Sequence, residues 1–212
     1  MGHVDDETYT GSVSHQMEFG DLSPQASRVL DAALTCIARV GLAKTTLDDV
    51  AREAGCARAT VYRCFSNKQQ LLTALVGREA LALRDTIAEA AAPHDAFEDA
   101  ITAAVVTSAR FLTNHQALTF VCAHEPEVLL PYLAFEREDA VLREAAALVA
   151  PAFTRFCDAT AAVRLGEWLA RTTLSYLCNP SDNFDLSDPE SVRVLVGEFI
   201  VPGFVKFQGV SR

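Results

Sequence analysis

The residues best suited to specific polar contacts lie in the run GCARATVYRCF, from Gly55 to Phe65. Successive residues of a helix are about 100° apart, so residues four apart share a face. On such a helix Val61 and Phe65 form an apolar face, and Ala59 and Arg63 lie about 160° from Val61. An arginine beside a small residue can approach a guanine edge in the DNA major groove. The segment therefore has one face for packing and one face suited to reading base pairs.

Side chains around this face add candidate contacts to the DNA backbone. Thr60 and Tyr62 lie at the two edges of the reading face, where hydroxyl groups can donate to phosphates. Arg58, in the first turn, can serve either face. Lys68 begins the next expected helix, and free amides together with a lysine ammonium at a helix start form an anion site.

Three expected helices position these side chains. A helix from Pro24 to Val40 is predicted by its cap, its first-turn proline and its apolar spacing. A shorter helix starts at Thr45 or Thr46 and ends at Gly55, and the third follows almost at once. Two short helices joined by a glycine turn are typical of a helix-turn-helix.

The charge of the chain is unevenly distributed. The formal net charge of the 212 residues is -10, yet residues 22–78 carry eight Lys or Arg against four Asp or Glu. Residues 1–21 carry five acids and no base and lack helical periodicity, which predicts a disordered tail. A basic segment within an acidic chain favours contact with a polyanion. No apolar run is long enough to span a bilayer, and no secretory signal is present, so we expect a cytoplasmic protein without membrane contact.

The run TTLDDVAREAGCARATVYRCFSNKQQLLTAL, residues 45–75, resembles the DNA-binding domain of the tetracycline-repressor (TetR) family of bacterial transcription regulators. The resemblance implies that the third helix enters the major groove of a double-stranded, pseudo-palindromic operator. It also implies phosphate contacts from Tyr62 and Lys68 and a backbone contact from the capping Thr46. The chain departs from the family at Ala57, where Ser is common, and at Cys64, where His is common. The candidate DNA-binding residues are Thr45, Thr46, Arg58, Ala59, Thr60, Tyr62, Arg63 and Lys68.

The expected fold class is all-α. An N-terminal three-helix helix-turn-helix domain, residues 22–70, is joined to a larger helical ligand-binding and dimerisation domain, residues 71–212. Further helices are expected at 68–92, 95–114, 116–123, 127–157 with interruptions at its prolines, 159–178 and 189–200. The apolar stretches that start at Val163 and Glu190 fit a four-helix dimer interface, as the resemblance implies, and a homodimer would engage two half-sites.

The larger domain contains candidates for binding a small-molecule effector. Apolar and aromatic side chains between helices are the usual lining of such pockets. We expect a mainly apolar or aromatic ligand, although four arginines (110, 137, 155 and 171) leave an acyl-CoA ligand open. The candidate ligand-binding residues are Phe111, His115, Phe120, His124, Tyr132, Phe135, Phe156 and Trp168.

The sequence argues against an enzyme. It contains no glycine-rich phosphate loop, no G-x-S-x-G elbow and no H-E-x-x-H motif, and no cofactor or metal is expected. The six cysteines have no zinc-finger spacing and are expected to be reduced. An alternative function is a DNA-binding regulator without a small-molecule effector, controlled by a protein partner or by thiol oxidation at Cys56 and Cys64.

Overall fold

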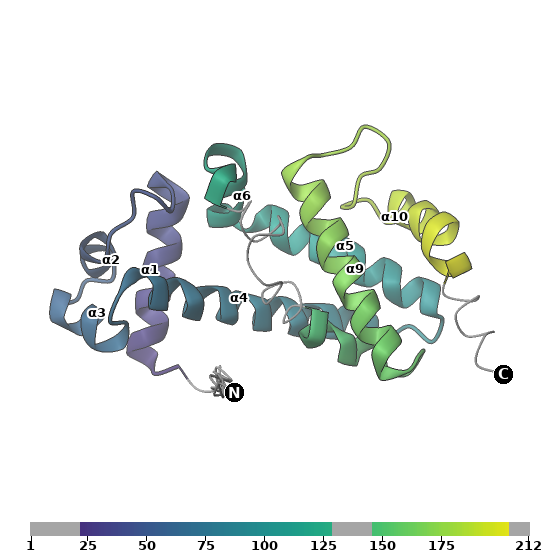
Figure 1. The fold of residues 1–212 in the computed structure, drawn as a ribbon, viewed down its shortest axis with the longest axis horizontal. Coiled ribbons are helices and arrows are strands. Elements are labelled where there is room, and N and C mark those ends of the chain that lie inside the picture. Colours follow the sequence, from purple (N-terminus) through teal and green to yellow (C-terminus); the bar gives the residue numbers. More distant parts are fainter. Residues whose placement is uncertain (1–21, 129–145, 204–212) are drawn as a thin grey trace, which may run out of the picture.

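The computed structural model describes residues 22–128 and 146–203, and these residues form helices and connecting turns without a β-strand (Figure 1). The prediction of an all-α chain is confirmed. The expected helix at 127–157 falls largely on residues 129–145, outside the described residues. The helices are α1 (Pro24–Val40), α2 (Leu47–Glu53), α3 (Arg58–Cys64), α4 (Lys68–Ala91), α5 (Phe97–Asn114), α6 (Gln116–His124), a 3-10 turn η1 (Ala150–Phe153), α9 (Ala159–Cys178), α10 (Pro189–Leu195) and a π-helical turn η2 (Val196–Ile200).

Local sequence signals determine where the first helices begin and end. The Ser23 side chain accepts a hydrogen bond from the amide of Ala26 at 3.2 Å, as the predicted cap requires. Thr46 is the cap of α2 and forms a reciprocal capping box with Asp49. Gly41 and Gly55 end α1 and α2 with φ values of 88° and 61°, which favour glycine. Ala57 starts α3 without a side-chain cap, as its sequence departure predicts.

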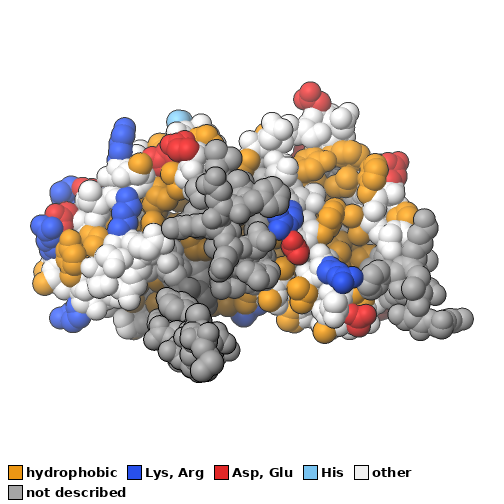
Figure 2. All heavy atoms as spheres, viewed as in Figure 1, with side chains coloured by type: hydrophobic (Ala, Val, Ile, Leu, Met, Phe, Trp, Pro, Cys, Tyr) orange, Lys and Arg blue, Asp and Glu red, His pale blue; other side chains and the backbone are white. Residues whose placement is uncertain are grey.

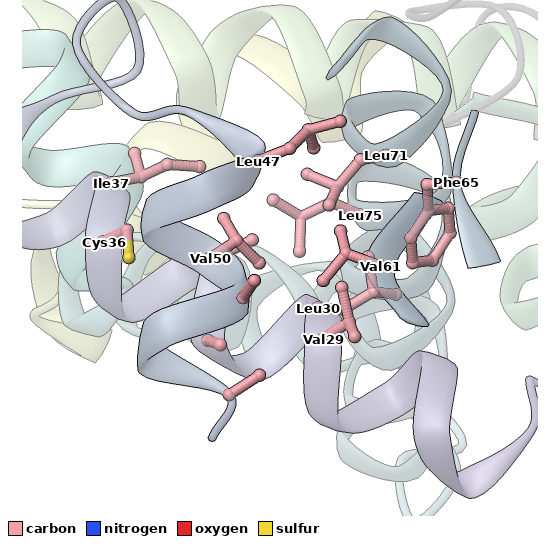
Figure 3. Close-up of a cluster of buried hydrophobic side chains, with 14 of the residues drawn as sticks. Val29, Leu30, Cys36, Ile37, Leu47, Val50, Val61, Phe65, Leu71 and Leu75 are labelled. Atoms are coloured by element: carbon pink, nitrogen blue, oxygen red, sulfur yellow. The ribbon is translucent and has the colours of Figure 1, made fainter. Parts of the chain in front are cut away.

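The buried side chains form two hydrophobic clusters. The first cluster joins α1, α2 and α3 and includes Val61 and Phe65 (Figure 3). It also takes Leu71 and Leu75 from α4 and two residues, Ala117 and Val121, from α6. The second cluster joins α5, η1, α9 and α10 around Phe153.

The two clusters define a head and a body. We call α1–α3 the head and α5, α9 and α10 the body. The long helix α4 begins at the head and runs along the body, where it packs on α5 (Figure 1). The predicted domain boundary at residue 70 lies inside this continuous helix. Helix α6 contacts α1 on one side and α9 on the other, so it connects head and body.

Candidate nucleic-acid interface

Helix α3 has the two faces that the sequence predicts. Val61 is fully buried and Phe65 is 4% exposed, and both pack in the head cluster (Figure 3). Ala59 and Arg63 are exposed, and Tyr62 is 42% exposed. Burial of the Val61 face fixes the rotation of α3, so the opposite face must point to solvent.

Arg63 is an exposed cation without a hydrogen bond or ion pair to any residue in the described ranges. Lys44, in the turn before α2, has the same two properties. Sequence reasoning missed Lys44, although its position directly before the two threonines was a signal. Three other arginines of the head pair with carboxylates: Arg39 with Glu53 at 3.1 Å, Arg52 with Asp49 at 3.1 Å and Arg58 with Asp48 at 2.6 Å. Lysine and arginine side chains gather over the head, and acidic side chains lie among them (Figure 2).

Arg58 supports Tyr62 within α3. Its guanidinium forms an ion pair with Asp48 of α2, lies 5.5 Å from the centre of the Tyr62 ring and is 3.5 Å from the phenol oxygen. These contacts tie α3 to α2 and orient the exposed tyrosine. Thr60 is half-buried beside Val61 at the edge of the exposed face.

Two of the candidate DNA-binding residues, Thr45 and Lys68, donate hydrogen bonds to backbone carbonyls of the head. Thr45 is 4% exposed, and its hydroxyl donates to the carbonyl of Gly41 at 2.6 Å. The Lys68 ammonium donates to the carbonyls of Leu42 and Ala43 at 2.6 and 3.3 Å. Burial lowers the pKa of Lys68. In this conformation both side chains hold the turn between α1 and α2.

Glu125 binds the backbone amides of the same turn. Glu125 is 8% exposed, and its carboxylate accepts hydrogen bonds from the amides of Leu42 at 2.6 Å and Ala43 at 3.2 Å. A Cβ on Gly41 would collide with this carboxylate and with the Phe120 ring. Lys68 therefore binds the carbonyls of the turn while Glu125, directly after α6, binds its amides. No local sequence pattern marks Glu125 for this role, because its partners are more than 80 positions away.

Two neighbouring cavities among the described residues lie beside α6, where head and body meet. A cavity of about 490 Å³ is lined by α1, α4, α6 and the last residue of α5, and a neighbouring one of about 470 Å³ by α4 and α5. Glu79, Asn114 and His115 line both, and Phe111 lines the second. Two of the eight predicted ligand-binding residues, Phe111 and His115, are thus brought together at these cavities.

His115 joins the cavities to the start of α6. Its Nδ1 accepts a hydrogen bond from the amide of Leu118 at 3.1 Å, and its Nε2 lies 3.4 Å from a Glu79 oxygen. An imidazole that accepts at Nδ1 can donate from Nε2, so His115 can hold the start of α6 and bond Glu79 at the same time. The hydrogen bond from His115, followed by Arg78, lowers the pKa of Glu79.

The other predicted ligand-binding residues lie elsewhere. Phe120 and His124 stack on each other with ring centres 4.4 Å apart. Phe156 packs edge-to-face on Phe97 at 5.8 Å, and Trp168 packs against the body cluster. Tyr132 and Phe135 lie outside the described residues.

The structure contains neither a metal cluster nor a membrane span in the part that it describes. No group of three or more His, Cys, Asp or Glu residues there could hold a metal ion. None of the described helices is both long and apolar enough to cross a bilayer.

Comparisons with known proteins point to one family. The family model described as bacterial regulatory proteins, tetR family, matches residues 29–75. An uncharacterized HTH-type transcriptional regulator of Mycobacterium tuberculosis is 30% identical over 185 residues, which are 84% of each chain.

Solved structures share the fold. The TetR family repressor AlkX from Dietzia, implicated in biodegradation of n-alkanes, is similar with a TM-score of 0.66 and 23% identity over 88% of this chain and 98% of that one. The transcriptional regulator FadR from Bacillus subtilis, in complex with stearoyl-CoA, is similar with a TM-score of 0.59 and 18% identity over 82% of this chain and 98% of that one. At these identities the likeness concerns the fold alone.

Proposed function

The chain belongs to the tetR family of bacterial regulatory proteins and is a DNA-binding transcriptional regulator; from this premise we propose a homodimeric repressor that a small ligand releases from its operator. The relatives are transcriptional regulators and not enzymes, in agreement with the sequence analysis. The proposed place of action is the cytoplasm, where the operator DNA lies.

The exposed face of α3 carries the proposal. Arg63 is long enough to donate two hydrogen bonds to a guanine, and Ala59 beside it lets the helix approach the groove closely. Tyr62, held by Arg58, is placed to donate to a phosphate, and Thr60 at the other edge can do the same. Base contacts of this kind select a sequence, whereas the phosphate contacts fix the register of the helix.

The capping Thr46 and the turn before α2 extend the proposed contact with the backbone. Thr46 is exposed at the start of α2, and Lys44 is an exposed cation two residues before it. We assign phosphate contacts to these two residues. Lys68 and Thr45 act instead by holding the turn that carries Lys44, because their polar groups are bonded to its carbonyls.

An exposed apolar surface on the body supports dimerisation. Val163 of α9 is 38% exposed, Val194 of α10 is 50% exposed and Phe199 of η2 is 63% exposed. Hydrophobic side chains gather over α9 and α10 on the face drawn in Figure 2. A second copy packed there would cover this surface and bring two heads to half-sites about 34 Å apart.

The cavities beside α6 support an effector site. A volume of about 490 Å³ suits a small organic molecule. Leu34 offers an apolar wall to the first cavity and Phe111 to the second, and the Asn114 amide, which lines both, offers hydrogen bonds. We therefore propose an effector with an apolar or aromatic body and a polar group. Because α1 and α6 both line the larger cavity, a ligand that prefers one spacing of these helices shifts the position of the head.

An acyl-CoA effector, as in the structure of FadR with stearoyl-CoA, has weaker support here. Binding of the coenzyme A phosphates would be favoured by several arginines that lie close together with their guanidinium groups available. Arg110 donates to the carbonyl of Ser187, Arg155 donates to three carbonyls at the end of α4 and just after it, and Arg171 pairs with Glu167. Each of these arginines has its own local partner, and Arg137 lies outside the described residues.

Selection of binding sites from a randomised duplex library tests the proposal. We expect the full chain to select a two-fold symmetric site and to bind it with two subunits, as measured by light scattering. A compound that raises the melting temperature should also dissociate this complex. Failure to bind any duplex at moderate salt, or binding of one subunit to one half-site, would overturn the proposal.

A further inference from the structure

Two cysteines that are far apart in the sequence meet where α6 contacts α9. Cys122 lies in α6, Cys178 is the last residue of α9, and their sulfur atoms are 3.4 Å apart. Both are free thiols. Because a disulfide bond is about 2.05 Å long, these sulfurs need to approach by roughly 1.4 Å to bond. This small shift is within reach of side-chain rotation and slight helix movement.

The two thiols differ in their surroundings. Cys178 is exposed, whereas Cys122 is half-buried. Burial, and then contact with the Cys178 sulfur, raises the pKa of the Cys122 thiol to about 12. An oxidant from solution therefore reaches the Cys178 sulfur first. The protonated Cys122 thiol is in contact with that sulfur on its buried side. An exposed thiol with a second thiol next to it is the arrangement of a redox-sensitive pair.

We propose that Cys122 and Cys178 form a reversible disulfide on exposure to a hydroperoxide, and that this bond weakens operator binding. In the first step the Cys178 sulfur attacks the hydroperoxide, the O–O bond breaks, and an alcohol leaves as a sulfenic acid forms. The Cys122 sulfur then attacks that sulfur, and its proton leaves with the hydroxide as water. Two thiols and one hydroperoxide give one disulfide, one alcohol and one water. A cellular dithiol restores the thiols by exchange.

Helix α6 connects the proposed disulfide to the DNA-binding head. Val121, next to Cys122, packs in the head cluster, and Glu125, about one turn further on, holds the amides of Leu42 and Ala43. Helix α6 contacts α1 and α9 (Figure 1). Shortening the sulfur–sulfur distance pulls α6 toward α9 and away from the turn before α2. The effect on DNA rests on the proposed function, whereas formation of the bond does not.

The test treats the reduced full chain with hydrogen peroxide, removes the excess, and divides the sample between two measurements. Non-reducing peptide mapping should find the Cys122 peptide linked to the Cys178 peptide, with the loss of two hydrogens. Binding to a duplex that the reduced chain has selected should weaken about fivefold or more, which is the lower end of allosteric couplings. Dithiothreitol should restore the affinity.

Matched variants separate this pair from the cysteines of the head. The Cys56→Ser, Cys64→Ser double variant should keep the full response, and Cys122→Ser and Cys178→Ser should each lose it. Absence of the linked peptide from the wild-type chain would overturn the proposal. A linked peptide with unchanged affinity would overturn its regulatory half. If the reduced chain selects no duplex, the proposed function fails, and the peptide map still decides whether the pair forms a bond.

Discussion

Replacement of Glu125 by alanine tests the connection between α6 and the head. Glu125 is 8% exposed, and its carboxylate accepts hydrogen bonds from the amides of Leu42 and Ala43 at 2.6 and 3.2 Å. Hydrogen bonds to a charged acceptor contribute about 1.5–3 kcal/mol each. Leu42 is half-buried and Ala43 is exposed, so water can reach part of the freed turn. We therefore expect Glu125→Ala to lower the free energy of unfolding by about 2 kcal/mol in total.

Thermal unfolding followed by circular dichroism measures this loss at a fixed protein concentration. For a chain of this size, about 2 kcal/mol corresponds to a melting temperature lower by about 4–8 °C. Glu125→Gln keeps one acceptor oxygen and should lose about half as much. Glu127, two residues further on, is exposed and has no hydrogen bond or ion pair to the described residues, so Glu127→Ala is the matched control. Equal melting temperatures for Glu125→Ala and Glu127→Ala would refute this role of Glu125.

Two further predictions concern the head core and the cavity. Val61→Ala removes two methyl groups from a fully buried site and should destabilise the chain by about 2 kcal/mol in urea unfolding, whereas Val76→Ala, at a site 51% exposed, should cost far less; equal costs would contradict the packing of α3. The lowered pKa of Glu79 gives stability that is present above the ordinary value of 4.5 and is lost as the pH falls through the folded value. Glu79→Gln should therefore reduce the loss of unfolding free energy between neutral and acid pH, whereas Glu89→Gln, at an exposed control site, should not. An unchanged dependence on acid pH in Glu79→Gln would count against the bond with His115.

The sequence predicts the helices and the faces of α3 well, because both depend on local periodicity. The orientation of side chains around Val61 depends only on residues within two turns of the helix. The structure buries the Val61 face of α3 as expected. The caps at Ser23 and Thr46 are similarly local signals.

Contacts between distant segments were beyond sequence reasoning. The phosphate contact predicted for Lys68 follows from its place at a helix start, and only the fold shows that its ammonium also donates to the carbonyls of Leu42 and Ala43. Glu125 and the pair of Cys122 with Cys178 depend on how α6 crosses α1 and α9, which no spacing in the sequence encodes.

Binding of the selected duplex and of its single base-pair variants by Arg63→Ala tests the central claim most directly. The account predicts that Arg63→Ala binds the selected duplex about 1–3 kcal/mol more weakly and no longer distinguishes one base pair in each half-site. Lys44→Ala removes an exposed cation of the head that, like Arg63, has no hydrogen bond or ion pair to the described residues. This variant should weaken binding to all duplexes alike and lower the salt slope by about one. An equal loss on every duplex for Arg63→Ala would contradict the claim that α3 reads the sequence through this residue.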